Sequence, residues 1–346
     1  MSYETDTKKV ILDVQNLNTS FISDKKEIKI VKDVSFQLKR GTCLAVVGES
    51  GCGKSVTMNS IMRFTGKNSK VTADKIQYNA LENDKVMEYH LEKVEKPNGP
   101  AMRALRGPHM SMVFQDPMSS LNPVYRVGDQ VAEGLLQHNK GMKKAEAREK
   151  VLEMFKKLGI PDPENRMNSY PHEFSGGQRQ RLCIARALEV HPEVLVCDEP
   201  VSALDVSIQA QVLNLMKEIQ KDMNLTYLFI AHDLSVVQYM SDRIVVMYLG
   251  KVVEIADSKA LYDEPLHPYT QALLSAIPVP DIHKTKKRQI LEGEVPSPIN
   301  KPSGCAFHNR CPKCMDICKT EDPALYNYDG KDHCVACHLY RNNANH

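Results

Sequence analysis

The chain has 346 residues, which is enough for one large domain and a smaller one. Its 45 lysines and arginines nearly balance its 43 aspartates and glutamates, so the net charge of +2 gives no electrostatic case for binding nucleic acid or an anionic membrane surface. Apolar runs such as 244–249 are far shorter than the roughly 18 residues that a membrane span needs. The polar stretch 1–9 shows no secretory signal, so we expect a cytosolic protein.

Segments rich in β-branched and aromatic residues predict strands near the N-terminus. These are Val10–Val14, Ile28–Val31 and Val34–Leu38. Phe21 lies between the first two of them in a polar segment. Its ring is either a platform for stacking an adenine or a core aromatic, and the segment alone does not decide between the two.

The most specific motif is a glycine-rich loop with the pattern G-x-x-x-x-G-K-S. It comprises Gly48, Glu49, Ser50, Gly51, Cys52, Gly53, Lys54 and Ser55. An apolar strand at 43–47 precedes the loop, and a helix at 56–64, beginning with Val56, follows it. In that context the backbone N–H groups and the helix N-terminus bind phosphate. We expect Lys54 to reach the β- and γ-phosphates of a nucleotide and the Ser55 hydroxyl to bind Mg²⁺.

Residues 66–107 are polar, and we interpret them as an insertion on the edge of a sheet. A buried strand at 110–114 follows and ends at Gln115, which either ligates Mg²⁺ or faces solvent. Apolar residues at helical spacing predict helices within 127–158, and the segment 159–163, with its glycine and two prolines, ends them.

A serine and two glycines come directly before a helix predicted at 179–188. The stretch consists of Ser175, Gly176, Gly177 and Gln178. It is either a second site for an anion at a helix N-terminus, or a plain helix cap with Ser175 as the capping residue.

An apolar strand that begins at Val194 ends in two carboxylates, Asp198 and Glu199. We expect Asp198 to serve Mg²⁺ and Glu199 to polarise an attacking water; the alternative is two solvated acids. Asp205 then precedes a helix predicted at 206–223. A further buried strand ends at His232, which either hydrogen-bonds the γ-phosphate or has a structural role.

The C-terminal part is rich in cysteine. Two short strands around Gly250 and a helix at 266–274 lead into a proline-rich linker over 278–304. Six of the ten cysteines of the chain lie in the tail at 305–346. In a cytosolic chain such a cluster favours a metal site over disulfides.

The order of these motifs resembles the ATP-binding cassette of ABC transporters over about residues 8–258. The similarity is closer still to the ATPase subunits of bacterial oligopeptide and dipeptide importers. It is carried by Phe114–Pro123, Asp198–Val206, Leu266–Pro278 and the run from Gly304 to Cys337. The resemblance implies an α/β fold with a RecA-like core, an antiparallel β subdomain and a helical subdomain. We expect three parts: the cassette at 8–258, a helix and linker at 259–304, and a metal-binding tail at 305–346.

The family pairs two cassettes head to tail with two ATP molecules between them. Each ATP would lie on the glycine-rich loop of one subunit and under Ser175–Gln178 and Asp205 of the other. The resemblance implies Lys54, Glu199 and His232 as catalytic residues, with Glu199 as the general base. It implies Ser55, Gln115 and Asp198 for Mg²⁺, and it implies Phe21 as the adenine platform. Phe174 departs from the leucine that is commonest in the family, and we expect no loss from this apolar replacement.

Some family members carry a [4Fe-4S] cluster on four cysteines of the tail. The matching residues are Cys305, Cys311, Cys318 and Cys337. The spacing by itself also fits a zinc site. That second set consists of Cys311, Cys314, Cys334 and Cys337. We favour the iron–sulfur cluster, and a tail without metal is the third possibility.

The resemblance implies an ATP-hydrolysing subunit that powers the import of di- and oligopeptides. It would lie on the cytoplasmic side of the cell membrane as a peripheral protein. Its expected partners are a second ABC ATPase subunit (a sister chain), two integral membrane permease subunits and an extracellular or periplasmic substrate-binding protein, with no nucleic acid. The alternatives are a nickel or antimicrobial-peptide importer and a soluble ABC ATPase of DNA repair or translation. The soluble class usually has two cassettes or a long coiled-coil arm, and this chain shows neither pattern.

Overall fold

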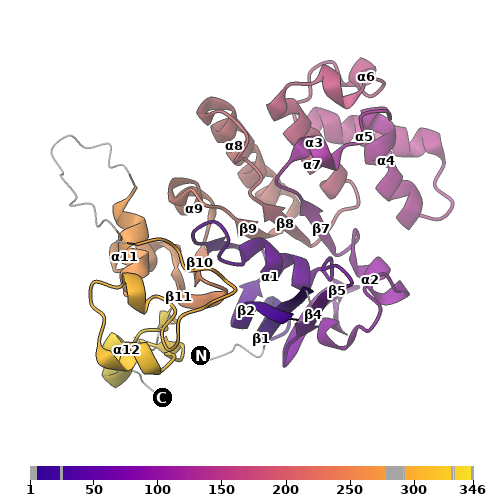
Figure 1. Ribbon diagram of the computed structural model, residues 1–346. Coiled ribbons are helices and arrows are strands. Elements are labelled where there is room, and N and C mark those ends of the chain that lie inside the picture. Colours follow the sequence, from indigo (N-terminus) through magenta and orange to yellow (C-terminus); the bar gives the residue numbers. More distant parts are fainter. Residues whose placement is uncertain are drawn as a thin grey trace. The chain divides into compact units, whose positions relative to one another are not determined.

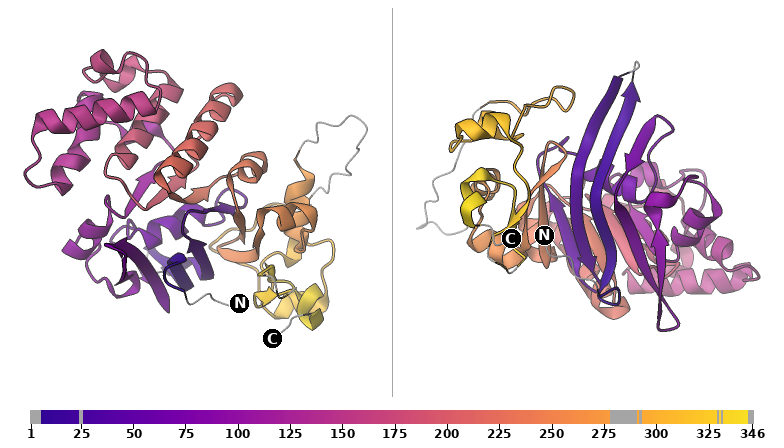
Figure 2. Two further views of the ribbon diagram at one scale, coloured as in Figure 1. Left: turned by 180° about the vertical axis from the view of Figure 1, so that it is seen from behind. Right: turned by 90° about the horizontal axis from the view of Figure 1, so that it is seen from below.

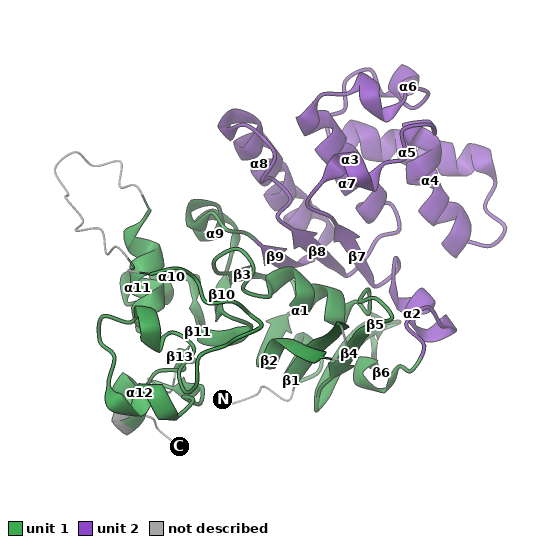
Figure 3. Cartoon of the chain, viewed as in Figure 1, with its two compact units in different colours: residues 1–95, 231–346 green, residues 96–230 purple. Residues whose placement is uncertain are grey.

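The computed structural model describes residues 6–23, 26–277, 291, 293–328, 330 and 332–343. The linker predicted at 278–304 therefore lies partly outside the described residues. The chain forms two compact units (Figure 3). Unit 1 comprises residues 1–95 and 231–346, and unit 2 comprises residues 96–230. Both units contain helices and strands (Figure 1), as the predicted α/β class requires.

An antiparallel sheet in unit 1 has the strand order β2-β1-β5-β6, and β4 pairs with the far part of β1. The strands are β1 (Val10–Ser23), β2 (Lys26–Lys39), β4 (Ser69–Thr72), β5 (Lys75–Glu82) and β6 (Lys85–His90). The three short strands predicted between residues 10 and 38 are parts of one long pair, β1 and β2, which run side by side (Figure 2).

The interpretation of residues 66–107 as an insertion on the sheet edge is wrong for β5, which lies between β1 and β6. Two of its residues are polar and yet buried, Gln77 and Asn79. Gln77 Nε2 donates to Asn79 Oδ1 at 2.7 Å, and Asn79 Nδ2 donates to the Val10 carbonyl at 2.7 Å. Because these bonds satisfy the buried amides, the strand tolerates a polar sequence that resembles a loop.

A second set of strands in unit 1 has the order β12-β13-β11-β10-β3. They are β3 (Cys43–Val47), β10 (Arg243–Tyr248), β11 (Lys251–Asp257), β12 (Tyr326–Asn327) and β13 (Cys334–Val335). β3 is parallel to β10, and all five of its residues are buried. The cysteine-rich tail joins this set because β13 pairs antiparallel with β11.

The helices of unit 1 are short. They are α1 (Lys54–Ile61), α9 (Leu234–Met240), α10 (Ser258–Asp263), α11 (Pro268–Ser275) and α12 (Asp316–Thr320), with 3-10 segments at Leu91–Lys93, His308–Arg310 and His338–Asn343. α1 begins directly after the glycine-rich loop, and α11 begins with a proline, where the lost N–H costs nothing.

Unit 2 contains three parallel strands in the order β7-β8-β9. The strands are β7 (Met110–Val113), β8 (Val194–Asp198) and β9 (Thr226–Ile230). The helices are α2 (Pro100–Leu105), α3 (Pro117–Ser120), α4 (Val127–His138), α5 (Lys144–Lys157), α6 (Pro163–Arg166), α7 (Gly176–Leu188) and α8 (Val206–Met223), with a 3-10 segment at Pro171–Glu173. The predicted strands and the predicted helix at 206–223 are confirmed here to within one residue. Over the described part of the chain, none of the helices has the length and apolar character to cross a membrane.

Candidate nucleotide-binding site

The glycine-rich loop connects β3 to α1, as predicted. Gly53 caps α1 at a φ of 101°, in the left-handed region that favours glycine. Gly48 has a φ of 151°, and a Cβ atom there would lie 2.2 Å from the Met247 carbonyl oxygen. The loop therefore depends on glycine at both places, and it leads directly into a helix N-terminus, where backbone N–H groups and the helix dipole favour phosphate.

Lys54 is the first residue of α1 and is only 5% exposed. Its Nζ donates to the carbonyl oxygens of Gly48 at 2.8 Å and Glu49 at 3.1 Å. These oxygens compensate the cost of burying the ammonium group. The side chain thus folds back over the loop, which is the position that the predicted phosphate contact needs. Ser55 is partly exposed in the first turn of α1.

Two residues for which the sequence predicted no function, Tyr269 and Arg310, contact this loop. The Glu49 N–H donates to the Tyr269 hydroxyl at 2.8 Å. The Arg310 guanidinium binds the Glu49 carboxylate through both oxygens, at 2.7 and 3.1 Å. Both residues lie in segments that carry the family resemblance, but no local sequence pattern indicates that they approach a loop more than 200 residues away.

Cys52 is buried within the loop, and burial raises the pKa of its thiol above the ordinary value. The group is therefore a neutral thiol at physiological pH and a poor nucleophile. Its carbonyl accepts a hydrogen bond from the Gly250 N–H at 2.8 Å. The turn between β10 and β11 thus supports the loop from one side.

Two further residues of unit 1 that were predicted to contact ATP are Phe21 and His232. Phe21 lies on β1, opposite Ile28 of β2, and is partly exposed, which disfavours the core interpretation. His232 is exposed and follows Ala231, whose N–H donates to the Val46 carbonyl at 3.4 Å. This bond places His232 at the end of β3 from which the glycine-rich loop emerges.

Unit 2 brings together Gln115 and the acidic pair of β8. β7 and β8 are parallel with Val113 opposite Cys197, so their carboxyl ends lie side by side. Gln115 Nε2 donates to Glu199 Oε2 at 3.0 Å. Asp198, the last residue of β8, is 8% exposed. The amide of Gln115 and the two carboxylates that end β8 therefore lie at the same edge of these strands.

The backbone at Glu199 has a φ of 46°, in the left-handed region that non-glycine residues rarely adopt. Its N–H donates to the Ile230 carbonyl at 3.0 Å, which fixes this conformation. Strain of this kind costs about 1–3 kcal/mol and tends to occur at functional sites. The conformation turns the carboxylate out of the strand and toward Gln115.

Ser175–Gln178 forms the first turn of α7. Ser175 Oγ accepts from the Gln178 N–H at 3.3 Å, and Gln178 Oε1 accepts from the Ser175 N–H at 3.1 Å. This is a capping box, so the helix-cap interpretation is confirmed. It does not exclude a role toward ATP, because Ser175 is exposed. Phe174 is buried under the Arg166 guanidinium, which lies 5.1 Å from its ring centroid.

Gly177 lies where α7 packs against α8. A Cβ atom there would lie 2.3 Å from Ile208 Cγ2, whereas at Gly176 the nearest contact is an ordinary 3.7 Å to Leu204. We expect Gly177→Ala to lower the free energy of unfolding by about 1–3 kcal/mol, because the β-branched Ile208 cannot move aside. Gly176→Ala is the matched control and should leave stability unchanged or slightly higher. Urea denaturation compares the two, and equal midpoints would contradict the expected overlap.

Asp205 caps α8. Its carboxylate accepts hydrogen bonds from Ser207 Oγ at 2.6 Å and the Ile208 N–H at 3.0 Å, and these bonds lower the pKa of the Asp205 carboxyl. The side chain is exposed and stays ionised at neutral pH. Its predicted contact with ATP of a second subunit remains a prediction.

The predicted metal site of the tail is not supported. Across the described residues, no group of three or more His, Cys, Asp or Glu side chains is arranged to hold a metal ion. Neither predicted set of ligands is therefore supported. The sets are Cys305, Cys311, Cys318 and Cys337 for iron–sulfur, and Cys311, Cys314, Cys334 and Cys337 for zinc. Spacing along the chain does not fix where thiols point, and two of them serve in packing: Cys334 is fully buried on β13, and Cys337 packs with Leu266 and Val335.

Two of these thiols are protonated at neutral pH because they are buried. Burial raises the pKa of Cys305 to about 11 and that of Cys337 to about 12. Both thiols are therefore neutral near pH 7. Hydrogen bonds and apolar contacts hold the tail, including a bond from the Cys305 N–H to the Cys318 carbonyl at 2.8 Å.

Comparison with known families gives two matches that together span most of the chain. Residues 31–202 match the ABC transporter family, and residues 253–318 match the C-terminal region of oligopeptide/dipeptide transporters. The chain is 48% identical to the oligopeptide transport ATP-binding protein AppF of Bacillus subtilis, over 91% of this chain and 90% of that protein. It is 45% identical to OppF of Escherichia coli, a protein of the same description, over 94% of this chain and 95% of that one. The dipeptide transport ATP-binding protein DppD of B. subtilis is 44% identical over 97% and 96%.

Solved structures agree on the fold. A dimeric ATP-binding cassette in a post-hydrolysis state with ADP and Pi has a TM-score of 0.60 at 23% identity, over 71% of this chain and 98% of that one. The cbiO1 protein of Clostridium perfringens, part of an ABC transporter complex, has a TM-score of 0.58 at 26% identity, over 74% and 92%. The fold is thus that of an ABC ATPase cassette, and the sequence resemblance is confirmed. The chain belongs to the ABC transporter ATPases, in the family of oligopeptide and dipeptide transport ATP-binding proteins.

Proposed function

We propose that this chain is the ATP-hydrolysing subunit that drives import of di- and oligopeptides through an ABC transporter. The observation that carries the proposal is the combination of a complete glycine-rich nucleotide loop with a C-terminal region of the peptide-transporter type. The relatives named for oligopeptide and dipeptide transport cover nearly the whole chain, tail included. A soluble repair or translation ATPase is disfavoured because the C-terminal match belongs to the transporter class.

Binding of ATP begins at the loop of unit 1. We assign the loop residues 48–56 to the phosphates, Lys54 to the β- and γ-phosphates, and the partly exposed ring of Phe21 to the adenine. Lys54 donates to two loop carbonyls, and phosphate oxygens would take over its hydrogen bonds. A charge-assisted bond to phosphate is roughly twice as strong as one to a neutral carbonyl, so the exchange is favourable.

Magnesium fits the oxygen donors predicted for it. Ser55, Gln115 and Asp198 offer a hydroxyl, an amide oxygen and a carboxylate, which are the hard ligands that Mg²⁺ prefers. When bound, the ion neutralises charge on the phosphates. Gln115 already donates its amide N–H to Glu199, and this leaves its amide oxygen available for the ion.

Hydrolysis needs a base for the attacking water, and we assign Glu199 to it. The carboxylate accepts a hydrogen bond from Gln115 Nε2 at 3.0 Å, which helps to fix its orientation. His232 lies at the end of β3 beside the loop and would hydrogen-bond the γ-phosphate. Proton abstraction by an oriented carboxylate contributes about a hundred- to ten-thousandfold to such a step.

The complete site would need a second cassette. We propose head-to-tail pairing in which Ser175–Gln178 and Asp205 of one subunit cover the ATP on the other. The exposed Ser175 at the N-terminus of the 13-residue helix α7 is suited to a phosphate. A sister chain is the expected second cassette, with two membrane permease subunits and an external substrate-binding protein completing the transporter. The chain would then be peripheral on the cytoplasmic side of the membrane.

Uptake by source cells tests the function and its cargo. Cells in which Lys54→Ala replaces the wild-type chain are given labelled dipeptides, oligopeptides and nickel. We expect loss of peptide uptake to background with nickel uptake unchanged, because the variant lacks the cation that holds ATP. Loss of nickel uptake alone would move the protein to the metal-importing branch. Unchanged uptake of all cargoes would contradict the transporter assignment, provided that competing peptide importers are deleted.

A further inference from the structure

The cysteine-rich tail contacts the nucleotide loop directly through one arginine. Arg310 ends the 3-10 segment His308–Arg310, and its side chain is 8% exposed. Both terminal nitrogens of its guanidinium bind the Glu49 carboxylate, at 2.7 and 3.1 Å. The two residues are 261 positions apart in the sequence. Because this ion pair is bidentate and nearly buried, it is stronger than an ion pair on an exposed surface.

Aromatic packing fixes the segment that carries Arg310. Phe307 is 1% exposed, and its ring lies 5.2 Å from that of Tyr248 on β10 and 5.4 Å from that of Tyr269 on α11, centroid to centroid. Glu49 and, to a lesser degree, the nearby Tyr248 hydroxyl raise the pKa of the Arg310 guanidinium. Tyr269 accepts the Glu49 N–H, so the same aromatic group holds both partners of the ion pair. Arg310 of the tail and Tyr269 of α11 therefore hold Glu49 in one position, the first through its carboxylate and the second through its backbone N–H.

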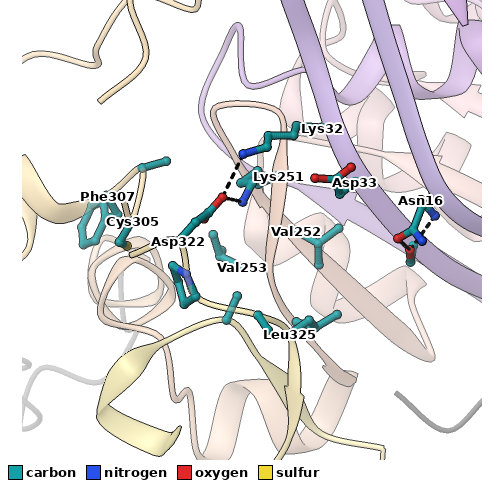
Figure 4. Close-up of a pocket in the computed structure, with 15 residues that line it drawn as sticks. Asn16, Lys32, Asp33, Lys251, Val252, Val253, Cys305, Phe307, Asp322 and Leu325 are labelled. Atoms are coloured by element: carbon teal, nitrogen blue, oxygen red, sulfur yellow. Dashed lines mark hydrogen bonds and ion pairs between the residues drawn. The ribbon is translucent and has the colours of Figure 1, made fainter. Parts of the chain in front are cut away.

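A second contact joins the tail to the same part of unit 1. Asp322 binds the ammonium groups of Lys32, at 3.0 Å, and of Lys251, at the rim of a cavity of about 480 Å³ (Figure 4). The Lys32 N–H donates to the Gly250 carbonyl, and the Gly250 N–H donates to the Cys52 carbonyl, both at 2.8 Å. The tail is thus connected to both ends of the Glu49–Cys52 stretch of the loop.

The negative charge of Glu49 makes these contacts important for nucleotide binding. A carboxylate in a loop that binds phosphate repels the nucleotide unless a cation neutralises it. We propose that Arg310 is a positioning residue of the nucleotide site, through which the C-terminal tail sets the affinity of the glycine-rich loop for ATP. Arg310 neutralises Glu49 and holds the loop backbone in the conformation that receives phosphate. The inference rests on the proposed nucleotide site and adds the tail to it.

Substitution at the two partners tests the proposal in the assembled transporter. We expect Arg310→Gln to raise the KM for ATP about ten- to a hundredfold while kcat changes less than about threefold, because it leaves Glu49 charged and unpaired beside the phosphates. Arg310→Lys keeps the charge and should restore part of the loss. The double variant Glu49→Gln with Arg310→Gln should bring the KM back to within a few fold of the Glu49→Gln single variant, since no unpaired charge remains.

The matched control is Arg341→Gln in the same tail, where Arg341 pairs with Glu321 at the surface, 3.5 Å apart and more than half exposed. Its KM should equal that of the wild type. Thermal unfolding of each full-length variant shows whether it is folded. A folded Arg310→Gln variant with an unchanged KM, or a double variant as impaired as Arg310→Gln alone, would overturn the proposal. Failure of the nucleotide site itself would give a different result, because the Lys54→Ala variant would then hydrolyse ATP normally.

Discussion

The Glu199→Gln variant is expected to bind ATP normally and to hydrolyse it at least about a hundredfold more slowly than the wild type. The amide has the size of the carboxylate but does not accept a proton from water, so the contribution of a general base is lost. The hydrogen bond from Gln115 survives because the glutamine oxygen still accepts it. The left-handed backbone at residue 199 is also undisturbed, since it depends on the bond to Ile230.

Phosphate release by the assembled transporter measures the turnover of this variant. Filter binding of labelled ATP measures its affinity for ATP, which should be unchanged. Glu193→Gln is the matched control: Glu193 comes just before β8 at its opposite end, where it pairs with His109 at 2.9 Å. That variant should hydrolyse ATP at the wild-type rate. A Glu199→Gln transporter that releases phosphate as fast as Glu193→Gln would show that another residue is the base.

Local sequence patterns were sufficient for the parts of the fold that are locally uniform. β3, β8 and β9 are short apolar runs in which every residue is buried, so composition alone identifies them. The glycine-rich loop could also be recognised from the sequence, because the backbone conformations at Gly48 and Gly53 favour glycine over other residues. Motif and strand occur next to each other in the chain, and no distant contact is needed to recognise them.

Sequence reasoning failed where a distant partner decides the outcome. Gln77 and Asn79 make β5 appear polar, and only the bond from Asn79 to Val10 shows why they are buried. Arg310 has no predicted role of its own within the run from Gly304 to Cys337, although its partner is Glu49. The family resemblance suggests the iron–sulfur set of cysteines and their spacing suggests the zinc set, whereas the direction of each thiol depends on how the tail packs.

Substitution of a glycine in the nucleotide loop is also expected to have a large effect, because it lowers both the stability of the fold and the affinity for ATP. Gly48→Ala would place Cβ 2.2 Å from the Met247 carbonyl oxygen and 2.7 Å from Cys52 Sγ, at a φ of 151°. The carbonyl belongs to β10, the parallel neighbour of β3, and cannot move aside without breaking the strand pairing. We expect the free energy of unfolding to fall by about 2–4 kcal/mol, from overlap and backbone strain together.

Gly51→Ala separates those two causes, because Gly51 has a φ of 77° but no atom within 4 Å of the added Cβ. It should lose only about 1 kcal/mol, the cost of a left-handed alanine. Urea unfolding of the full-length variants gives both values, and equal losses would contradict the overlap at Gly48. ATP binding by the folded fraction of Gly48→Ala should also be lost, because the displaced loop no longer directs its N–H groups at one phosphate. Stability and affinity thus depend on the same glycine, since the strand that supports the loop also prevents it from adopting another shape.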